Sequence, residues 1–282
     1  VVNGAGAAAI SCTRLYCSFG ARKENIVMLD SRGVIRVDRE NLTEQKREFA
    51  TTRDIHTLEE AVKDADVFVG LSKGNVLSKD MVRSMAKNPI IFALANPVPE
   101  ISYEDAKDAR PDVLMSTGRT DYPNQINNVI GFPYIFRGAL DTAAKAINEE
   151  MKLAAARAIA DLARRPVPDI VNRAYHVRNF TFGPDYFIPK PVDPRLITEV
   201  SMAVAKAAIE SGVARKVITD WKAYRQQLRE LMGQESKLTQ NLYDTARLSP
   251  RRVVFAEGTH PTMLEAAIRA KEEGICHPVL LG

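Results

Sequence analysis

The sequence predicts an α/β fold in which a doubly wound parallel sheet is followed by extra C-terminal helices and a truncated second α/β domain. Up to residue 120, short apolar runs alternate with helical segments of about ten residues, which is the pattern of consecutive βαβ units. A glycine-rich turn, GAGAAA at residues 4–9, follows the first apolar run directly. A strand, a helix and a strand at residues 251–282 then stand apart from the rest.

The elements of the first 120 residues follow from these apolar runs. We expect strands at residues 1–2, 25–30, 66–72, 89–97 and 112–118. Helices are expected at residues 7–20, 43–50, 56–65, 78–87 and 102–109. Because at least one helix separates every two consecutive strands, the strands should pair in parallel through crossover connections.

The chain becomes mainly helical after residue 120. Residues 127–165 are expected to be helical, and the clearest amphipathic helix is residues 149–165. One face of that helix should hold Leu153, Ala156, Ala160 and Ala163. Residues 179–195 contain four prolines and four aromatic side chains, which predicts an ordered loop. Further helices are expected at residues 195–211 and from Trp221 to about residue 232.

These patterns predict a division into two domains. Residues 1–232 form the first, residues 233–250 are a linker, and residues 251–282 begin the second. In the second domain we expect strands at residues 251–258 and 277–282 around a helix at 260–274. A single β-α-β unit cannot bury both faces of its sheet, so we interpret it as the N-terminal fragment of a larger domain.

Composition limits the class of protein. The chain has 282 residues, of which 45% are hydrophobic and 26% charged, as in globular proteins. The net charge of +4 is small and does not favour nucleic-acid binding. The three cysteines form no CxxC pair, which favours a reducing, cytoplasmic compartment. No apolar run reaches the roughly 18 residues of a membrane span, and there is no signal-peptide pattern.

The glycine-rich turn predicts a Rossmann-like domain that binds NAD or NADP. Its sequence fits G-x-G-x-x-A between a strand and a helix, so the helix N-terminus can bind a pyrophosphate. The second strand ends in Asp30, about 20 residues further on, where an acid contacts the adenosine ribose. The cofactor-binding residues expected in the turn are Gly4, Ala5, Gly6, Ala7 and Ala8. The alternative is a plain strand–turn–helix corner.

The residues after Asp30 favour NADP over NAD. A carboxylate alone would repel the 2′-phosphate of NADP, but Ser31 and Arg32 follow it and can offset that repulsion. Lys46 and Arg47 offer further cations, although each by itself is more simply a solvated surface charge. We therefore expect NADP, with NAD as the alternative.

Polar residues at the ends of later strands are candidates for ligand contacts. Ser72 and Asn96 fall at the carboxyl edge of the predicted sheet, where doubly wound folds bind ligands. Asn96 can bond a carboxamide, a ribose hydroxyl or a carboxylate, or form an Asx turn before Pro97. Of the neighbouring Asn127 and Asn128, one is expected to cap a helix and the other to reach a ligand.

A complete reaction centre is not visible in the sequence. There is no HExxH or other clustered metal-ligand pattern, and the four histidines are scattered. Asp121 and Tyr122 are loose acid–base candidates only. We therefore assign no catalytic residue and no metal ligand to this chain.

Several segments together resemble malic enzyme, most closely its large bacterial NADP-dependent form. They are GAGAAAI (4–10), FALANPVPE (92–100), GRTDYPNQINNVIGFPYIFRGALD (118–141), MKLAAARAIADLA (151–163) and FGPDYFIPKPVDPRL (182–196). The resemblance covers residues 1 to about 230. Residues 251–282 resemble the start of a phosphate acetyltransferase domain, which is fused behind malic enzyme in the bacterial form.

The resemblance implies oxidative decarboxylation of (S)-malate to pyruvate and CO₂ with reduction of NADP, assisted by Mg²⁺ or Mn²⁺. It implies that the glycine loop and Asp30 bind the cofactor and that Ser31 and Arg32 bear on the 2′-phosphate. It also implies that Asn96 contacts nicotinamide ribose and substrate, and that Asn128, or Asn127 beside it, is the second asparagine facing the substrate.

The family's catalytic tyrosine and lysine and its three carboxylate metal ligands lie upstream of the glycine loop. We therefore expect this chain to need an N-terminal catalytic domain and the rest of the acetyltransferase-like domain, to be inactive alone, and to work in a homo-oligomer. Two alternatives stay open. One is an NAD(P)-dependent dehydrogenase of another substrate class, and the other is a non-catalytic nucleotide-binding or oligomerisation module.

Overall fold

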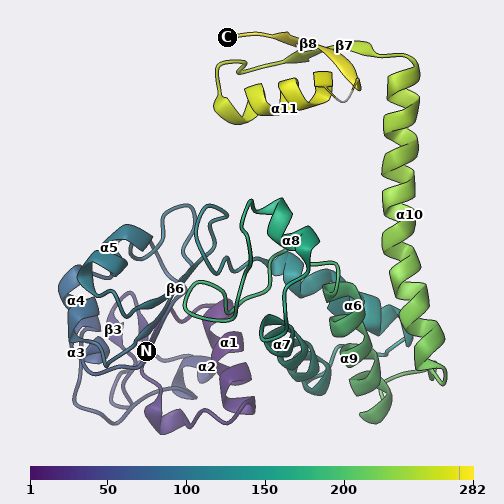
Figure 1. Ribbon diagram of the computed structural model, residues 1–282. Helices are drawn as coiled ribbons and strands as arrows, with labels where there is room; N and C mark the ends of the chain where they lie inside the picture. The colour runs from purple at the N-terminus through teal and green to yellow at the C-terminus, as the bar shows by residue number, and fades with distance from the viewer. Residues whose placement is uncertain (273) are drawn as a thin grey trace. The chain divides into compact units, whose positions relative to one another are not determined.

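The computed structural model describes residues 1–272 and 274–282, without the side chains of residues 233–241, 243, 244, 265 and 269 (Figure 1). The chain forms two compact units, Val1–Ile218 and Thr219–Gly282. The first unit contains a mostly parallel sheet followed by a group of helices. The second contains a long helix and a two-stranded sheet.

The sheet of the first unit has the strand order β3-β2-β1-β4-β5-β6. All neighbours pair in parallel except β3, which runs antiparallel to β2. The strands are β1 (Val2–Asn3), β2 (Met28–Asp30), β3 (Gly33–Val34), β4 (Val67–Gly70), β5 (Ile90–Ala93) and β6 (Leu114–Thr117). The predicted doubly wound sheet is thus confirmed. Its strand order reverses between β1 and β4, where such folds bind ligands.

Helices cover both faces of this sheet, with α3, α4 and α5 on one face and α1 and α2 on the other (Figure 1). They are α1 (Ala7–Ser18), α2 (Glu44–Arg47), α3 (Leu58–Val62), α4 (Lys79–Ser84) and α5 (Tyr103–Ala109). Neighbouring side chains of β4 show the two layers, since Phe68 packs in one core cluster and Val69 in the other. Strands buried on both faces explain the continuous apolar runs of the sequence.

Polar caps fix where several of these helices begin. Thr43, Thr57, Ser78 and Ser102 precede α2, α3, α4 and α5, and each side chain accepts a hydrogen bond from a backbone N–H of the first turn. Thr57 forms a full capping box with Glu60. These caps satisfy N–H groups that the helix itself leaves unpaired.

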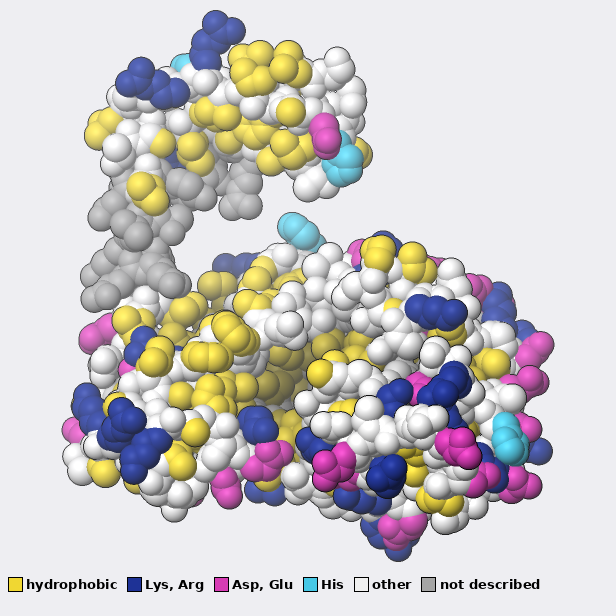
Figure 2. Space-filling view, turned by 180° about the vertical axis from the view of Figure 1, so that it is seen from behind, with side chains coloured by type: hydrophobic (Ala, Val, Ile, Leu, Met, Phe, Trp, Pro, Cys, Tyr) yellow, Lys and Arg dark blue, Asp and Glu magenta, His cyan; other side chains and the backbone are white. Residues whose placement is uncertain are grey.

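The helical part of the first unit packs around α9 (Leu196–Glu210). Its other elements are the 3₁₀ turn η2 (Asn128–Ile130), α6 (Phe132–Asp141), α7 (Glu149–Ala163) and α8 (Asp169–Ala174). A Cβ on Gly138 of α6 would lie 2.6 Å from the Ser201 carbonyl oxygen, so glycine permits the close approach of α6 to α9. Figure 2 shows hydrophobic side chains gathered over this part, and those exposed on α6 are Phe132, Phe136 and Leu140.

One predicted helix face is partly wrong. In α7 the buried side chains are Met151, Ala155, Leu162 and Ala163. Ala160, which we expected on the buried face, is exposed. The larger Met151 and Leu162 bury more apolar area than the alanines, so their positions determine how the helix is rotated toward α9.

The second unit consists of α10 (Trp221–Leu248), β7 (Arg251–Phe255), α11 (Pro261–Glu272) and β8 (Cys276–Leu280), with β7 and β8 parallel. The helix beginning at Trp221 was expected to end near residue 232, but it continues to Leu248. A single glycine at position 233 lowers helix stability by only about 1 kcal/mol and does not end a helix. The first proline after Trp221 is Pro250. Val253 and Val254 of β7 are 40% and 58% exposed.

One short strand and one short α-helix were not predicted, nor was the 3₁₀ turn η1 (Lys23–Asn25). The strand β3 forms a hairpin with β2 because Gly33 adopts a φ of +101°, a conformation that favours glycine. The helix α8 follows Pro168, which we interpreted only as the stop of the preceding helix. The predicted proline-rich loop at 179–195 is confirmed, with one bridge between Gly183 and Tyr186.

Candidate dinucleotide-binding site

The glycine loop lies where β1 ends, at the point where the strand order reverses. Gly4 has a φ of +127°, and a Cβ there would lie 2.4 Å from the Leu71 carbonyl oxygen. The Gly4 N–H donates to the Leu29 carbonyl at 2.9 Å. Only glycine fits a position with this φ and this close approach to a neighbouring strand end. Gly4 therefore fixes the turn that directs the chain from β1 into α1.

The N-terminus of α1 is open to a ligand. The first helical hydrogen bond runs from the Ile10 N–H to the Gly6 carbonyl at 3.0 Å. Gly6, Ala7 and Ala8 are exposed, and nothing lies within 4 Å of the position of a Gly6 Cβ. Within the described chain no side chain caps this helix, and its first turn has no acidic residue. The free N–H groups can therefore bind phosphate oxygens.

Asp30, at the end of β2, is already paired with two cations. Its carboxylate accepts hydrogen bonds from Arg39 Nη2 at 3.0 Å and from Lys46 Nζ at 2.7 Å. The side chain of Asp30 is only 8% exposed. Burial raises the pKa of this carboxyl, but hydrogen bonds from Lys46, the Arg32 backbone N–H and Arg39 outweigh that effect and lower the pKa below its ordinary value. Asp30 is thus a charged but neutralised acid.

The two residues after Asp30 lie on the surface. Ser31 and Arg32 are exposed, and the Arg32 backbone N–H donates to Asp30 Oδ1 at 2.9 Å. Among the described residues, the Arg32 guanidinium has no hydrogen-bond or ion-pair partner. Arg39 was missed by sequence reasoning, because its contact with Asp30 depends on the unpredicted hairpin between β2 and β3. Lys46 was weighed and set aside as a surface charge, whereas here it contacts Asp30 directly.

Glu100 joins the ends of β4 and β5. It is fully buried, and its two carboxyl oxygens accept hydrogen bonds from the backbone N–H groups of Ser72 at 3.1 Å and Ala95 at 3.0 Å. The Ser72 hydroxyl in turn accepts a hydrogen bond from the Asn3 side chain at 2.9 Å. Glu100 was also missed by sequence reasoning, since an acid in the loop PVPE has no distinguishing spacing.

The candidate asparagines lie on loops at the same edge of the sheet. Asn96 is exposed, and its side-chain amide lies 3.5 Å from the position of a Gly118 Cβ, beyond the end of β6. Asn127 accepts a hydrogen bond from the Val129 N–H at 3.0 Å and is the N-cap of η2. Asn128 is exposed. Of the neighbouring pair, Asn127 therefore has the capping role and Asn128 is the one available to a ligand.

Asp121 and Tyr122 do not form an acid–base pair. Asp121 pairs with Arg119 at 2.6 Å, and the Tyr122 hydroxyl donates to Glu104 at 2.7 Å. No group of three or more His, Cys, Asp or Glu side chains that could hold a metal ion occurs in the part of the chain that was searched, residues 1–272 and 274–282 with the side chains described. None of the described helices is long and apolar enough to cross a membrane.

The reversed strand order, the glycine loop and the acid at the end of β2 define a dinucleotide-binding domain of the Rossmann type. Residues 1–172 match the family model for the malic enzyme NAD binding domain, and residues 237–282 match that for phosphate acetyl/butaryl transferase. The chain belongs to the malic enzyme family, and its first unit is a nicotinamide-cofactor-binding domain.

Relatives cover the whole chain. It is 51% identical over 283 residues to the NADP-dependent malic enzyme of Rhizobium meliloti (strain 1021), covering 100% of this chain and 37% of the relative. It is 47% identical to the NAD-dependent malic enzyme of the same organism, with the same coverage. The crystal structure of Entamoeba histolytica malic enzyme has a TM-score of 0.78 at 31% identity, covering 97% of this chain and 54% of that one. The chain thus spans little more than a third of these two relatives' length.

Proposed function

We propose that the protein to which this chain belongs oxidatively decarboxylates (S)-malate to pyruvate and CO₂ while reducing NADP. This chain would supply the cofactor-binding part. The observation that carries the proposal is the open glycine loop at the reversal of strand order in a domain of the malic enzyme family. NADP-dependent malic enzymes that match over the whole chain support it.

In this proposal each part of the chain has a defined task. The N-terminus of α1 binds the pyrophosphate, Asp30 orients the adenosine ribose, and Ser72 borders the cofactor. Asn96 and Asn128 bind malate so that its C2 hydride faces the nicotinamide. A divalent Mg²⁺ or Mn²⁺ would supply Lewis-acid chemistry, but the described residues of this chain offer no cluster to hold it. We propose that the metal ligands and the proton-transfer groups lie on an N-terminal catalytic domain.

Malate kinetics test the substrate assignment. In the full-length protein, Asn96→Ala and Asn128→Ala should each lower kcat/KM for malate by about ten-fold or more, because each removes a polar contact to the substrate. NADP affinity should change much less. Asn25→Ala removes an equally exposed amide and is the control. Unchanged malate kinetics in both variants would favour a dehydrogenase of another substrate class.

We also infer that NADP is the preferred cofactor. The ammonium of Lys46 and the guanidinium of Arg39 offset the charge of Asp30, so the 2′-phosphate of NADP would meet a neutralised acid. Arg32, exposed beside them, offers a further cation. NAD stays the alternative, since both NADP- and NAD-dependent relatives match this chain.

Cofactor selectivity tests this inference. Arg32→Ala and Lys46→Met should each weaken NADP binding by about ten-fold or more and NAD binding by less than about three-fold, because only NADP carries the 2′-phosphate. Calorimetric titration of both cofactors measures the difference, with the exposed Lys63→Met as control. An equal loss for both cofactors would show that these cations do not bind the 2′-phosphate.

The remaining proposals concern the whole protein. We propose that residues 1–232 act as the cofactor domain, that residues 233–250 connect it, and that residues 251–282 begin a phosphate acetyltransferase-like domain, which the second family match supports. We further propose that the protein acts as a homo-oligomer in the cytoplasm. A non-catalytic nucleotide-binding or oligomerisation module is the second candidate function, and failure of the full-length protein to bind NADP or NAD would contradict the malate activity and favour this second candidate.

A further inference from the structure

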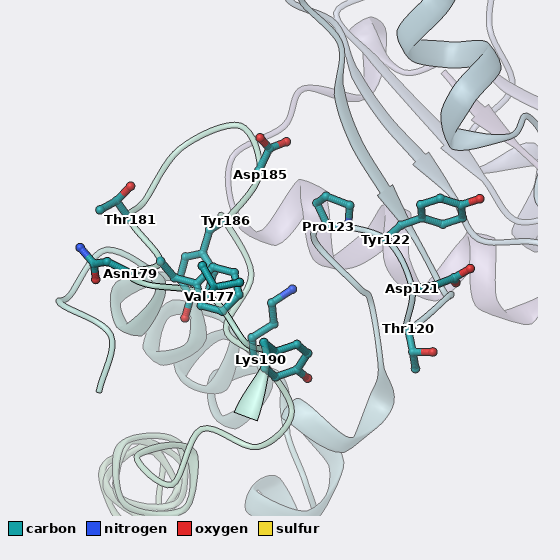
Figure 3. Close-up of a pocket in the computed structure, with 12 residues that line it drawn as sticks. Thr120, Asp121, Tyr122, Pro123, Val177, Asn179, Thr181, Asp185, Tyr186 and Lys190 are labelled. Carbon is teal, nitrogen blue, oxygen red and sulfur yellow. The ribbon is translucent and has the colours of Figure 1, made fainter. Parts of the chain in front are cut away.

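A second hollow in the first unit lies between two loops, residues 120–123 after β6 and residues 175–190 after α8. The hollow is open to solvent and has a volume of about 420 Å³. Figure 3 shows the Lys190 side chain reaching into it, with its ammonium between Pro123 on one side and Val177 and Tyr186 on the other. None of the candidate cofactor or malate contacts described above lines this hollow, which we call the Lys190 pocket.

Lys190 is a buried cation without an acidic partner. It is 7% exposed, and its Nζ lies 5.0 Å from the centre of the Tyr175 ring and 5.1 Å from that of Phe180. Within the described side chains no carboxylate pairs with it. Asp193 is taken by Arg195 at 2.6 Å, and Figure 3 shows the Asp185 carboxylate at the rim, turned away from the ammonium. Two aromatic faces stabilise the charge only in part.

Asp121, the other acid that lines the pocket, pairs with Arg119. Burial lowers the pKa of Lys190, as expected for an ammonium whose charge lacks a counterion. The pocket therefore presents one positive charge that the described acids leave uncompensated.

Tyr186, which also lines the pocket, carries an unsatisfied polar atom. The residue is 2% exposed, and its hydroxyl oxygen has no hydrogen-bond partner in the described part of the chain. The Lys190 backbone N–H approaches this oxygen without reaching hydrogen-bond geometry. Burial raises the pKa of Tyr186 to about 12, so at neutral pH the group is a hydrogen-bond donor. The oxygen itself is buried, so the hydroxyl belongs to the packed wall of the pocket and not to its open part.

We propose that the Lys190 pocket binds a small carboxylic acid, with the carboxylate held by the Lys190 ammonium and the apolar part packed against Val177 and Pro123. One cation matches the single charge of a carboxylate. A phosphate dianion would require a second cation, and Lys190 is the one Lys or Arg among the described residues that line the pocket. The inference does not depend on the proposed malate activity.

The test uses the full-length protein with benzoate as the probe and inorganic phosphate as the comparison. Calorimetry should give a benzoate Kd of about 1 mM or tighter, as expected for a ligand of this size, and weaker binding of phosphate. Crystals soaked in 4-bromobenzoate should show the anomalous signal of bromine beside Lys190. The measurement does not involve malate or NADP, so its failure is distinguishable from failure of the proposed function.

Three variants make the test specific. Lys190→Met keeps the length of the side chain and removes the charge, and it should weaken benzoate binding by about ten-fold or more. Tyr186→Phe removes only the buried hydroxyl and should leave benzoate binding within about two-fold of the wild type, without loss of thermal stability. Lys145→Met makes the same change as Lys190→Met at an exposed position and should have no effect.

Three results would overturn the proposal. The first is an absence of benzoate binding, as expected if another segment of the full-length protein fills the pocket. The second is equal benzoate binding by the wild type and Lys190→Met. The third is tighter binding of phosphate than of benzoate, which would contradict the assignment to a carboxylate.

Discussion

Replacing Glu100 by alanine should lower the free energy of unfolding by about 3–5 kcal/mol. The substitution removes both acceptors of the Ser72 and Ala95 N–H groups, which lie in a part-buried setting, and leaves these donors without their partner. It also opens a cavity next to Gly70, where a Cβ would lie 2.3 Å from Glu100 Cδ. For a unit of about 220 residues, this loss corresponds to a decrease in melting temperature of roughly 8–15 °C.

Thermal unfolding followed by circular dichroism measures this effect. Glu100→Gln should cost less, about 1–3 kcal/mol, because its amide keeps one acceptor oxygen but turns a donor toward the other N–H group. Glu59→Ala removes an exposed glutamate from the first turn of α3 and should stay within about 1 kcal/mol of the wild type. If Glu100→Ala were no more destabilising than Glu59→Ala, Glu100 would not hold the two strand ends together.

Replacing Gly6 by alanine should strongly weaken cofactor binding while the fold stays intact. Gly6 has ordinary backbone angles, φ −82° and ψ −176°, and nothing lies within 4 Å of the position of its Cβ. The added methyl group would occupy the space in which a pyrophosphate approaches the backbone. We expect a loss of NADP and NAD affinity on the order of 100-fold, or about 2.7 kcal/mol. The melting temperature should fall by no more than about 4 °C.

Two other glycines make this measurement specific. Gly4→Ala should destabilise the fold itself, since its φ is +127° and its Cβ would lie 2.4 Å from the Leu71 carbonyl oxygen. Gly20→Ala introduces strain at a φ of +104° in open space, so it should cost stability without affecting binding. If Gly6→Ala bound NADP as tightly as the wild type, the glycine loop would not be the pyrophosphate site.

The regular elements could be predicted from the sequence because they depend on local patterns. All five strands and five helices expected before residue 120 are present, although most are shorter than expected. The strand β3 was not predicted, because two residues in an antiparallel hairpin give no period. The end of α10 was placed too early because residues 233–250 were interpreted as a linker.

The details of the site could be predicted only where one residue carries the information. Gly4 and Asp30 are recognised by their distance from strand ends. The partners of Asp30 are not, because Arg39 and Lys46 reach it across a turn and a helix whose geometry no spacing rule fixes. Lys190 and Tyr186 stood in a proline-rich loop without periodicity, so their burial in one pocket followed only from the three-dimensional structure.

Glu100 couples the loop that follows β4 to the loop that follows β5. One oxygen of the Glu100 carboxylate accepts a hydrogen bond from the Ser72 N–H, and the other accepts one from the N–H of Ala95, next to Asn96. A ligand that orders either loop therefore reduces the conformational entropy that the second ligand must still remove. We expect the nucleotide cofactor and the carboxylic acid substrate to bind with positive cooperativity. This cooperativity requires no rearrangement of the sheet.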